Sequence, residues 1–263
     1  MARILTDGRL ASLPLTAGME ESASVCLACD NPSLLAGQLC DGKAQAALIP
    51  VFELHCSQRP LTIIPAACVS FCGAAPTLQI LSHRPAKRIE TLWIKAEDKS
   101  AAVLAEVIWW HEFSRRLRVL PFLSSRGSPP ADAEAILSTS DSLITASSSS
   151  FQHHFDLGAL WSEITGLPLV TQVWAAVDNA TLDNLYALLL EARRVGDRRL
   201  ADIAAAFARE HSCPVEVVEA YLTRRVQTEL TDAHREGLED FFDLAMRGGV
   251  IDQPRPLHFF ETG

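Results

Sequence analysis

Apolar and polar positions along the first two thirds of the chain follow two alternating patterns. Short apolar runs predict strands at 3–5, 25–28, 46–49, 61–71, 77–82, 91–95, 118–122, 142–145 and 169–177. Helical spacing predicts helices at 31–40, from 50 onward, at 100–113 and at 131–137. The helix at 31–40 has the clearest start, because Asn31 is a good N-cap and Pro32 fits the first turn.

The last third of the chain has a different character. From residue 182 onward no strand is predicted, and helices are predicted at 187–194, 199–210, 214–222 and 233–246. Pro214 lies just inside one helix start, and Gly248 follows a helix end. Alternating strands and helices followed by a helical tail predict an α/β protein with a mainly parallel sheet covered by helices.

Two segments suit a passage of the chain between two lobes. Segment 83–87 is short, basic and contains a proline, which is typical of a crossover, and 167–177 suits the return. We therefore expect a first lobe of residues 1–84 and 178–263 and a second lobe of residues 85–177. The serine-rich stretch 147–150 favours a flexible loop over a ligand-binding loop.

The stretch 60–82 has no charged residue and is the one candidate for a membrane span. It contains Pro65, Gly73 and Pro76, which would interrupt a spanning helix. Two buried strands joined by a turn fit this stretch better, so we expect no membrane partner.

Composition and charge narrow the class of protein. Apolar residues make up 48% and charged residues 21% of the 263 residues, which is typical of a globular chain with a sizeable core. The net charge is −9, from 23 basic and 32 acidic residues. This excess of acid argues against a nucleic-acid partner, although a small anionic ligand remains compatible with a local cleft.

The familiar catalytic and metal-binding motifs do not occur in the sequence. Cys26 and Cys29 have CxxC spacing, but no second pair follows, and on a strand the two thiols would face opposite sides. His111-Glu112 lacks the second histidine of a zincin, and His153-His154 suit a surface loop. The first residues lack the apolar run of a secretory signal, so we expect seven free thiols and a cytoplasmic protein.

Hydroxyl side chains are scattered near predicted strand ends and helix starts. They are Ser70, Thr77, Ser82, Ser100, Thr145 and Ser147. Ser100 opens a long helix, whose free N–H groups and dipole favour an anion. Its hydroxyl would therefore either bind a carboxylate or cap the helix, and the sequence leaves both open.

Several longer segments resemble one known family. Ala46-Ala-Leu-Ile-Pro50 with Glu53 resembles D-x-A-L-I-P-x-x-E-Y. Phe155-Asp-Leu-Gly-Ala-Leu-Trp161, followed by Thr165-Gly-Leu-Pro-Leu-Val170 and Val173-Trp-Ala-Ala, resembles Y-D-L-G-x-x-W-x-x-x-T-G-L-P-F-V-F-A-V-W-A. Leu10-Ala-Ser-Leu-Pro-Leu15 resembles the end of Y-L-N-A-x-P-L. These are segments of the menaquinone-biosynthesis dehydratases, the chorismate dehydratases of the futalosine route, and the matches follow the family order through nearly the whole chain.

The resemblance implies a fold and a reaction. The fold would be two-lobed, like the type II periplasmic binding proteins, with a helical C-terminal tail and two lobes closing over chorismate. The reaction would remove water from chorismate to give 3-[(1-carboxyvinyl)oxy]benzoate, with no metal and no organic cofactor. Formation of an aromatic ring drives this step, so the protein mainly orients a dicarboxylate and excludes water.

The resemblance also implies a set of substrate-binding positions. They are Arg9, Ala11, Thr77, Ser100, Ala101, Thr145 and Ser147. Thr77, Ser100 and Ser147 would hold carboxylates, and Arg9 would add a further contact. No residue stands out as the proton acceptor, for which the substrate's own carboxylate is a candidate.

Several of these positions depart from the family pattern. Ala11 stands for the Asn of Y-L-N-A-x-P-L, and Arg9 for its Tyr. The helix start S-x-T-S becomes Asp98-Lys-Ser100-Ala101, and the loop I-G-D becomes Thr145-Ala-Ser147. Thr77 replaces a serine of similar chemistry.

Three hypotheses about function follow. The first is a chorismate dehydratase-like lyase. The second is a binding protein on the same fold, either without turnover or specific for another small aromatic or enolpyruvyl carboxylate, which the loss of the Asn at position 11 favours. The third is an interaction protein with the helical tail as partner surface, although packing explains the apolar spacing there more simply. The sequence leaves open whether the protein forms an oligomer.

Overall fold

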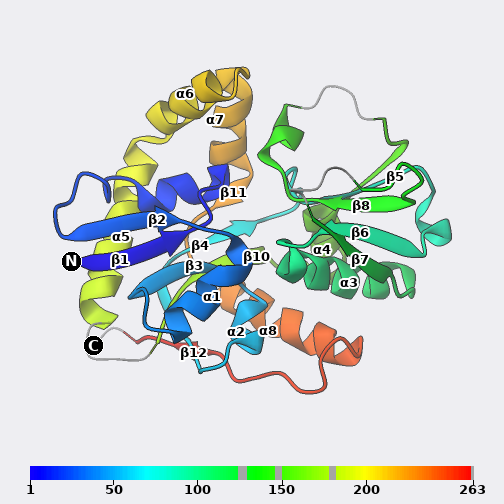
Figure 1. Ribbon diagram of the computed structural model, residues 1–263, viewed down its shortest axis with the longest axis horizontal. Coiled ribbons are helices and arrows are strands. Elements are labelled where there is room, and N and C mark those ends of the chain that lie inside the picture. The colour runs from blue at the N-terminus through cyan, green and yellow to red at the C-terminus, as the bar shows by residue number, and fades with distance from the viewer. Residues whose placement is uncertain (124–128, 146–149, 178–181, 262–263) are drawn as a thin grey trace.

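The computed structural model describes residues 1–123, 129–145, 150–177 and 182–261, which form two lobes, each built on one sheet (Figure 1). The sheet of the first lobe has the order β11-β4-β10-β3-β1-β2, and β12 also pairs with β4. Its strands are β1 (Ala2–Thr6), β2 (Val25–Cys29), β3 (Ala46–Pro50), β4 (Thr62–Phe71), β10 (Leu169–Ala176), β11 (Val226–Gln227) and β12 (His258–Phe259). The sheet of the second lobe has the order β7-β6-β8-β5-β9. Its strands are β5 (Gln79–Ser82), β6 (Thr91–Lys95), β7 (Arg118–Phe122), β8 (Ala135–Ser138) and β9 (His153–Asp156).

Helices cover both sheets. Those that follow strands of the first lobe or form the tail are η1 (Leu10–Thr16), α1 (Pro32–Cys40), α2 (Glu53–Cys56), α5 (Leu182–Arg198), α6 (Leu200–Glu210), α7 (Val215–Arg224) and α8 (Asp232–Arg247). Those of the second lobe are η2 (Ala86–Arg88), α3 (Lys99–Phe113), η4 (Asp141–Ile144) and α4 (Leu157–Thr165). Helix α8 contacts β10 of the first lobe and α3 of the second, and so runs beneath both (Figure 1).

Local signals account for the elements that were predicted well. The α1 helix begins as expected, with the Asn31 side chain accepting a hydrogen bond from the Ser33 N–H and a proline at the first position. The charge-free stretch 60–82 forms β4 and β5, and most of β4 is buried, as in a strand covered on both faces. None of the described helices is long and apolar enough to cross a membrane.

Both sheets are mixed, which corrects the expectation of a mainly parallel sheet. Among the described strands, five pairings are parallel and five are antiparallel. The chain leaves the first lobe at the end of β4 and returns through β10, its neighbour in the same sheet. Because β10 starts opposite the residue at which β4 ends, it runs antiparallel to β4, and it is antiparallel to β3 as well.

The sheet pairings also place the two chain crossings differently from the expected boundaries after residues 84 and 177. β5 pairs with β8 and β9 and therefore belongs to the second lobe, whereas β10 belongs to the first. The chain thus crosses between the lobes at residues 72–78 and again between α4 and β10, at 166–168, and the expected crossover at 83–87 lies inside the second lobe.

Five short elements differ from the sequence prediction. The predicted helix at 131–137 is replaced by β8, and the predicted strand at 142–145 is the 3-10 turn η4. The histidines expected on a loop begin β9, and the tail contributes β11 and β12. Each of the four strands among these is short and depends on pairing with a strand distant in sequence, which local spacing does not reveal.

The first crossing is fastened to the start of α4. Asp156 caps α4 by accepting from the Ala159 N–H at 3.0 Å, and the same oxygen accepts from the Ala75 N–H at 2.8 Å. Gly158 lies so close that a Cβ there would come within 2.4 Å of the Gly73 carbonyl oxygen. The Asp-Leu-Gly motif therefore holds the joint between the lobes.

Candidate functional site

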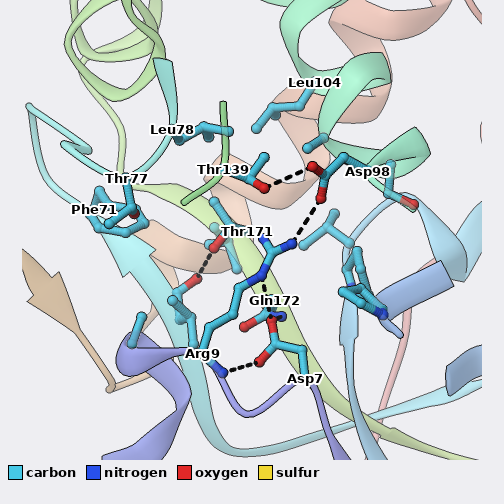
Figure 2. A pocket seen from close by; sticks show the side chains of 18 of the residues that line it. Asp7, Arg9, Phe71, Thr77, Leu78, Asp98, Leu104, Thr139, Thr171 and Gln172 are labelled. Carbon is cyan, nitrogen blue, oxygen red and sulfur yellow. Dashed lines mark hydrogen bonds and ion pairs between the residues drawn. The ribbon is translucent and has the colours of Figure 1, made fainter. Parts of the chain in front are cut away.

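A cavity of about 100 Å³ lies between the lobes, and both lobes contribute to its lining. The first lobe supplies residues after β1, from β4 and β10, and from α7 and α8, while the second supplies the start of α3 and the segment around β8. Figure 2 shows that Arg9 extends upward from Asp7 toward Asp98, with Phe71 and Thr77 to one side. The cavity therefore lies at the ends of strands from two sheets, where binding sites of open α/β folds are usually found.

Five of the seven positions expected to bind substrate line this one cavity. They are Arg9, Ala11, Thr77, Ser100 and Ala101. Thr145 lies in a neighbouring groove that shares Arg9, Thr139 and Asp141 with the cavity. Ser147 lies outside the described residues.

Arg9 links the two lobes through an ion pair. Its Nη2 donates to Asp98 Oδ1 at 2.8 Å, and its Nε lies 3.6 Å from Asp7 Oδ2 (Figure 2). Arg9 precedes η1 in the first lobe, whereas Asp98 immediately precedes α3 in the second. Burial opposes the charge on Arg9, but Asp98 and Asp7 more than offset it and raise the pKa of the guanidinium.

Other side chains fix the two aspartates that face Arg9. Asp7 accepts from Gln172 Nε2 at 2.7 Å, from Ser12 Oγ at 2.9 Å and from the Arg9 N–H at 3.1 Å. Asp98 accepts from Thr139 Oγ1 at 2.9 Å through its second oxygen. Both carboxylates are buried, with 1% and 2% of their side chains exposed, so the guanidinium lies between two fixed negative groups.

Two more hydrogen bonds cross the cleft. The Leu10 N–H donates to Asp141 Oδ2 at 2.9 Å, and Ser100 Oγ donates to Glu53 Oε1 at 2.7 Å. Burial is the largest cause that raises the pKa of the Asp141 and Glu53 carboxyls. The residue that precedes α3 is Asp98, so the Ser100 hydroxyl does not cap the helix but binds the opposite lobe.

Thr77 adds a hydroxyl to the site, whereas Ala11 adds no polar side-chain atom. Thr77 Oγ1 lies 3.0 Å from the Tyr221 hydroxyl, and both residues are almost fully buried. Burial strongly raises the pKa of Tyr221, so its hydroxyl stays protonated and either oxygen can donate. Ala11 is 8% exposed and presents only a methyl group.

The remaining lining is apolar, and the charge balance of the site is negative. Val69, Phe71, Leu78, Leu104 and Phe241 supply carbon surface suited to a ring. Of the described residues that line the cavity, four carry carboxylates and Arg9 alone is a Lys, Arg or His. The site can therefore hold an apolar ring and form hydrogen bonds from its hydroxyls to polar substituents of that ring. A second negative group on a ligand would be repelled by the carboxylates.

Several important residues escaped the sequence prediction. Asp7, Thr139, Asp141, Gln172 and Tyr221 line the cavity but were not singled out. Asp7 follows β1 directly, a position at the carboxyl end of a strand that favours a binding role. Asp98 and Arg9 both stand where the chain departs from the family pattern, and that coincidence was the available signal for their contact.

Comparisons with known proteins agree with this architecture. A sequence model of a family described as menaquinone biosynthesis matches residues 10–247. A structural-genomics protein from Archaeoglobus fulgidus superimposes with a TM-score of 0.76 at 13% identity, covering 95% of this chain and 98% of that one. The periplasmic aliphatic sulphonate binding protein SsuA of Escherichia coli gives a TM-score of 0.62 at 11% identity, covering 96% and 94%.

The alkanesulfonate-binding protein SsuA of Xanthomonas axonopodis, solved with MOPS bound, also gives a TM-score of 0.62, at 13% identity with 97% and 94% covered. At such identities these likenesses establish the fold alone. They confirm the predicted two-lobed α/β fold of the periplasmic-binding-protein type.

Proposed function

Because this chain belongs to the menaquinone biosynthesis family, we propose that it is a chorismate dehydratase-like carbon–oxygen lyase. In this proposal it acts in the cytoplasm, on the futalosine route, and converts chorismate to 3-[(1-carboxyvinyl)oxy]benzoate between its two lobes. One observation carries the proposal: five of the residues that the resemblance indicates for substrate binding, far apart in sequence, line the same inter-lobe cavity.

The chemistry suits the residues of the cavity. The apolar surface of Phe71, Leu104 and Phe241 would hold the ring and keep water away from it. The hydroxyls of Thr77 and Ser100 would orient the substrate. The ring proton would pass to the substrate's own carboxylate, the C–O bond to the ring hydroxyl would break, and proton and hydroxide would leave together as water. No external oxidant is needed, and the new aromatic ring supplies the driving force.

A second candidate function is a binding protein without turnover, or with specificity for a different small carboxylate. Two observations favour it. Ala11 brings no polar atom to the position of the family Asn, and the guanidinium of Arg9 is already paired with Asp98. Such a protein would be stabilised by its ligand by RT ln(1 + [L]/Kd) without forming product.

Incubation of the purified protein with chorismate, followed by chromatography with mass detection, tests the proposal. We expect the dehydrated benzoate to form faster than in buffer. An Ala11→Asn variant should gain about tenfold in kcat/KM, because one added hydrogen bond at the transition state contributes about 1–3 kcal/mol.

The results for the natural protein and for the Ala11→Asn variant together distinguish the two candidate functions. Product formation by the Ala11→Asn variant alone would show that the natural protein has lost or redirected its activity. If neither protein forms product but carboxylates raise the melting temperature, the lyase proposal is wrong and the binding function stands.

A further inference from the structure

We propose that Asp98 is a specificity-determining residue, a carboxylate of the protein itself that competes with a ligand carboxylate for Arg9. The proposal rests on the proposed function only in requiring that the inter-lobe cavity takes a small aromatic carboxylate. It concerns which charge the cavity prefers, and it holds with or without turnover.

Arg9 is the natural contact for a ligand carboxylate. Among the described residues of the lining it alone carries a fixed positive charge. One third of its side chain is exposed, and Figure 2 shows it crossing the space between Asp7 and Asp98. Guanidinium groups bind carboxylates through parallel N–H donors, so a carboxylate entering the cavity is drawn to this residue.

Asp98 already occupies the position beside the Arg9 guanidinium that a ligand carboxylate would take. Its Oδ1 accepts from Arg9 Nη2 at 2.8 Å, the geometry that a ligand carboxylate would adopt. Thr139 holds the other oxygen at 2.9 Å, and the carboxylate is almost fully buried. Asp98 is therefore a fixed partner that a ligand has to share or displace.

The effect of Asp98 on a ligand is electrostatic. A ligand carboxylate that reaches Arg9 comes within a few ångströms of Asp98, and Asp7 lies on the other side of the guanidinium. At such separations in a partly buried site, like charges repel substantially. An uncharged ligand of the same shape experiences none of this repulsion. Asp98 therefore lowers the preference of the cavity for an acid over its amide.

The test uses benzoate and benzamide, which have nearly the same shape and differ in charge. Their affinities are measured by isothermal titration calorimetry for the natural protein, for Asp98→Asn and for Asp98→Ser. We expect the ratio of benzoate to benzamide affinity to rise tenfold or more in both variants, while benzamide affinity changes less than threefold. A merely structural role of Asp98 would change both affinities together and leave the ratio constant.

A control variant keeps the charge of Asp98 and removes a hydrogen bond that holds this side chain in place. Thr139→Val deletes the hydrogen bond to Asp98 Oδ2 and should leave the ratio within threefold of the natural value. Because two different replacements are made at position 98, the test still works if one of the variants does not fold. An unchanged or lowered ratio in the folded variants would overturn the proposal, as would failure of every protein to bind either probe.

The outcome is independent of catalysis. If no variant dehydrates chorismate but the ratio rises, the role of Asp98 stands and the lyase proposal fails. If the natural protein dehydrates chorismate and Asp98→Asn leaves both KM and the ratio unchanged, the lyase proposal stands and the role of Asp98 is wrong.

Discussion

Two networks of buried polar side chains, one in the cleft and one behind β4, differ in charge and in what they join. The cleft network joins two lobes through the charged groups of Asp7, Arg9 and Asp98. The network behind β4 joins elements of the first lobe through neutral groups. His234 Nε2 lies 2.9 Å from Ser70 Oγ, which donates to the Gln227 carbonyl oxygen at 3.1 Å.

The direction of the hydrogen bonds in the neutral network indicates a structural role. The Thr231 N–H donates to His234 Nδ1 at 3.3 Å, so the ring proton is on Nε2 and points at Ser70. A nucleophilic serine needs the opposite, a histidine that accepts its proton. The Ser70–His234 contact therefore fastens α8 to β4, whereas the charged contact of Arg9 with Asp98 joins the two lobes beside the cavity.

Replacement of Arg9 by methionine gives the largest expected effect on stability. Among the described residues, the buried Asp98 side chain would keep Thr139 as its one hydrogen-bond partner. We expect the free energy of unfolding to fall by about 2–3 kcal/mol, below the usual cost of breaking a buried ion pair because Arg9 is partly exposed. Urea unfolding measures it. Arg198→Met, at an exposed pair with Glu191, should cost less than about 0.5 kcal/mol, and equal losses in both variants would contradict the distinction.

Ser70→Ala is expected to have an intermediate effect. It removes the fully buried hydroxyl that partners Nε2 of the buried His234 and the Gln227 carbonyl oxygen. The free energy of unfolding should fall by about 1–2 kcal/mol, while benzoate and benzamide affinities stay within twofold of the natural values. Ser22→Ala, at an exposed serine pair, is the control with no expected change. A loss of benzoate and benzamide affinity in Ser70→Ala would show that the two networks are coupled.

Acidification gives the smallest expected effect on stability. Its contribution from His234 is opposite in sign to its contribution from the cleft carboxylates Glu53 and Asp141. Burial lowers the pKa of His234, so below about pH 6.5 the unfolded chain takes up a proton that the folded chain does not. The stability associated with neutral His234 is therefore lost as the pH falls from that value toward the lowered pKa. The Glu53 and Asp141 carboxyls have raised pKa values and act in the opposite sense, stabilising the fold as they take up protons at lower pH.

Melting temperatures of the natural protein and of His234→Gln, recorded between pH 7.5 and about pH 5, measure this effect. We expect the natural protein to lose more stability over this range than the variant does. Parallel curves would show that His234 does not titrate differently in the folded and unfolded states.

Local signals were sufficient for most of the fold. Asn31 and Pro32 start α1 by their own chemistry, and the apolar run at 61–71 forms β4 because it is covered on both faces. The mixed sheets and the strands β8 and β9 were missed, since they depend on partners far away in the chain. The segments 83–87 and 167–177 and the resemblance to a family both indicated two lobes, but the true crossings depend on strand pairings that no local pattern contains.

The site was predictable in its positions and not in its contacts. Hydroxyls near strand ends and helix starts marked Thr77 and Ser100, the resemblance marked Ala101, and the cavity gathers all three. The partner of Arg9 was not predictable, because 89 positions separate it from Asp98 and no periodicity relates them. Arg9 was expected to be available to a ligand, whereas the structure pairs it with the protein itself.

The antiparallel pairing of β4 with β10 has a consequence for the architecture as a whole. Phe71, the last residue of β4, lies directly opposite Leu169, the first residue of β10. Topologically, the entire second lobe is therefore the loop of one β-hairpin, inserted where a tight turn of two residues would otherwise stand. Since the entropy of closing a loop grows slowly with its length, such a hairpin tolerates a whole domain as its loop. Asp98 lies within this loop, so the inserted lobe supplies the partner of Arg9, and the sheet that carries the hairpin does not.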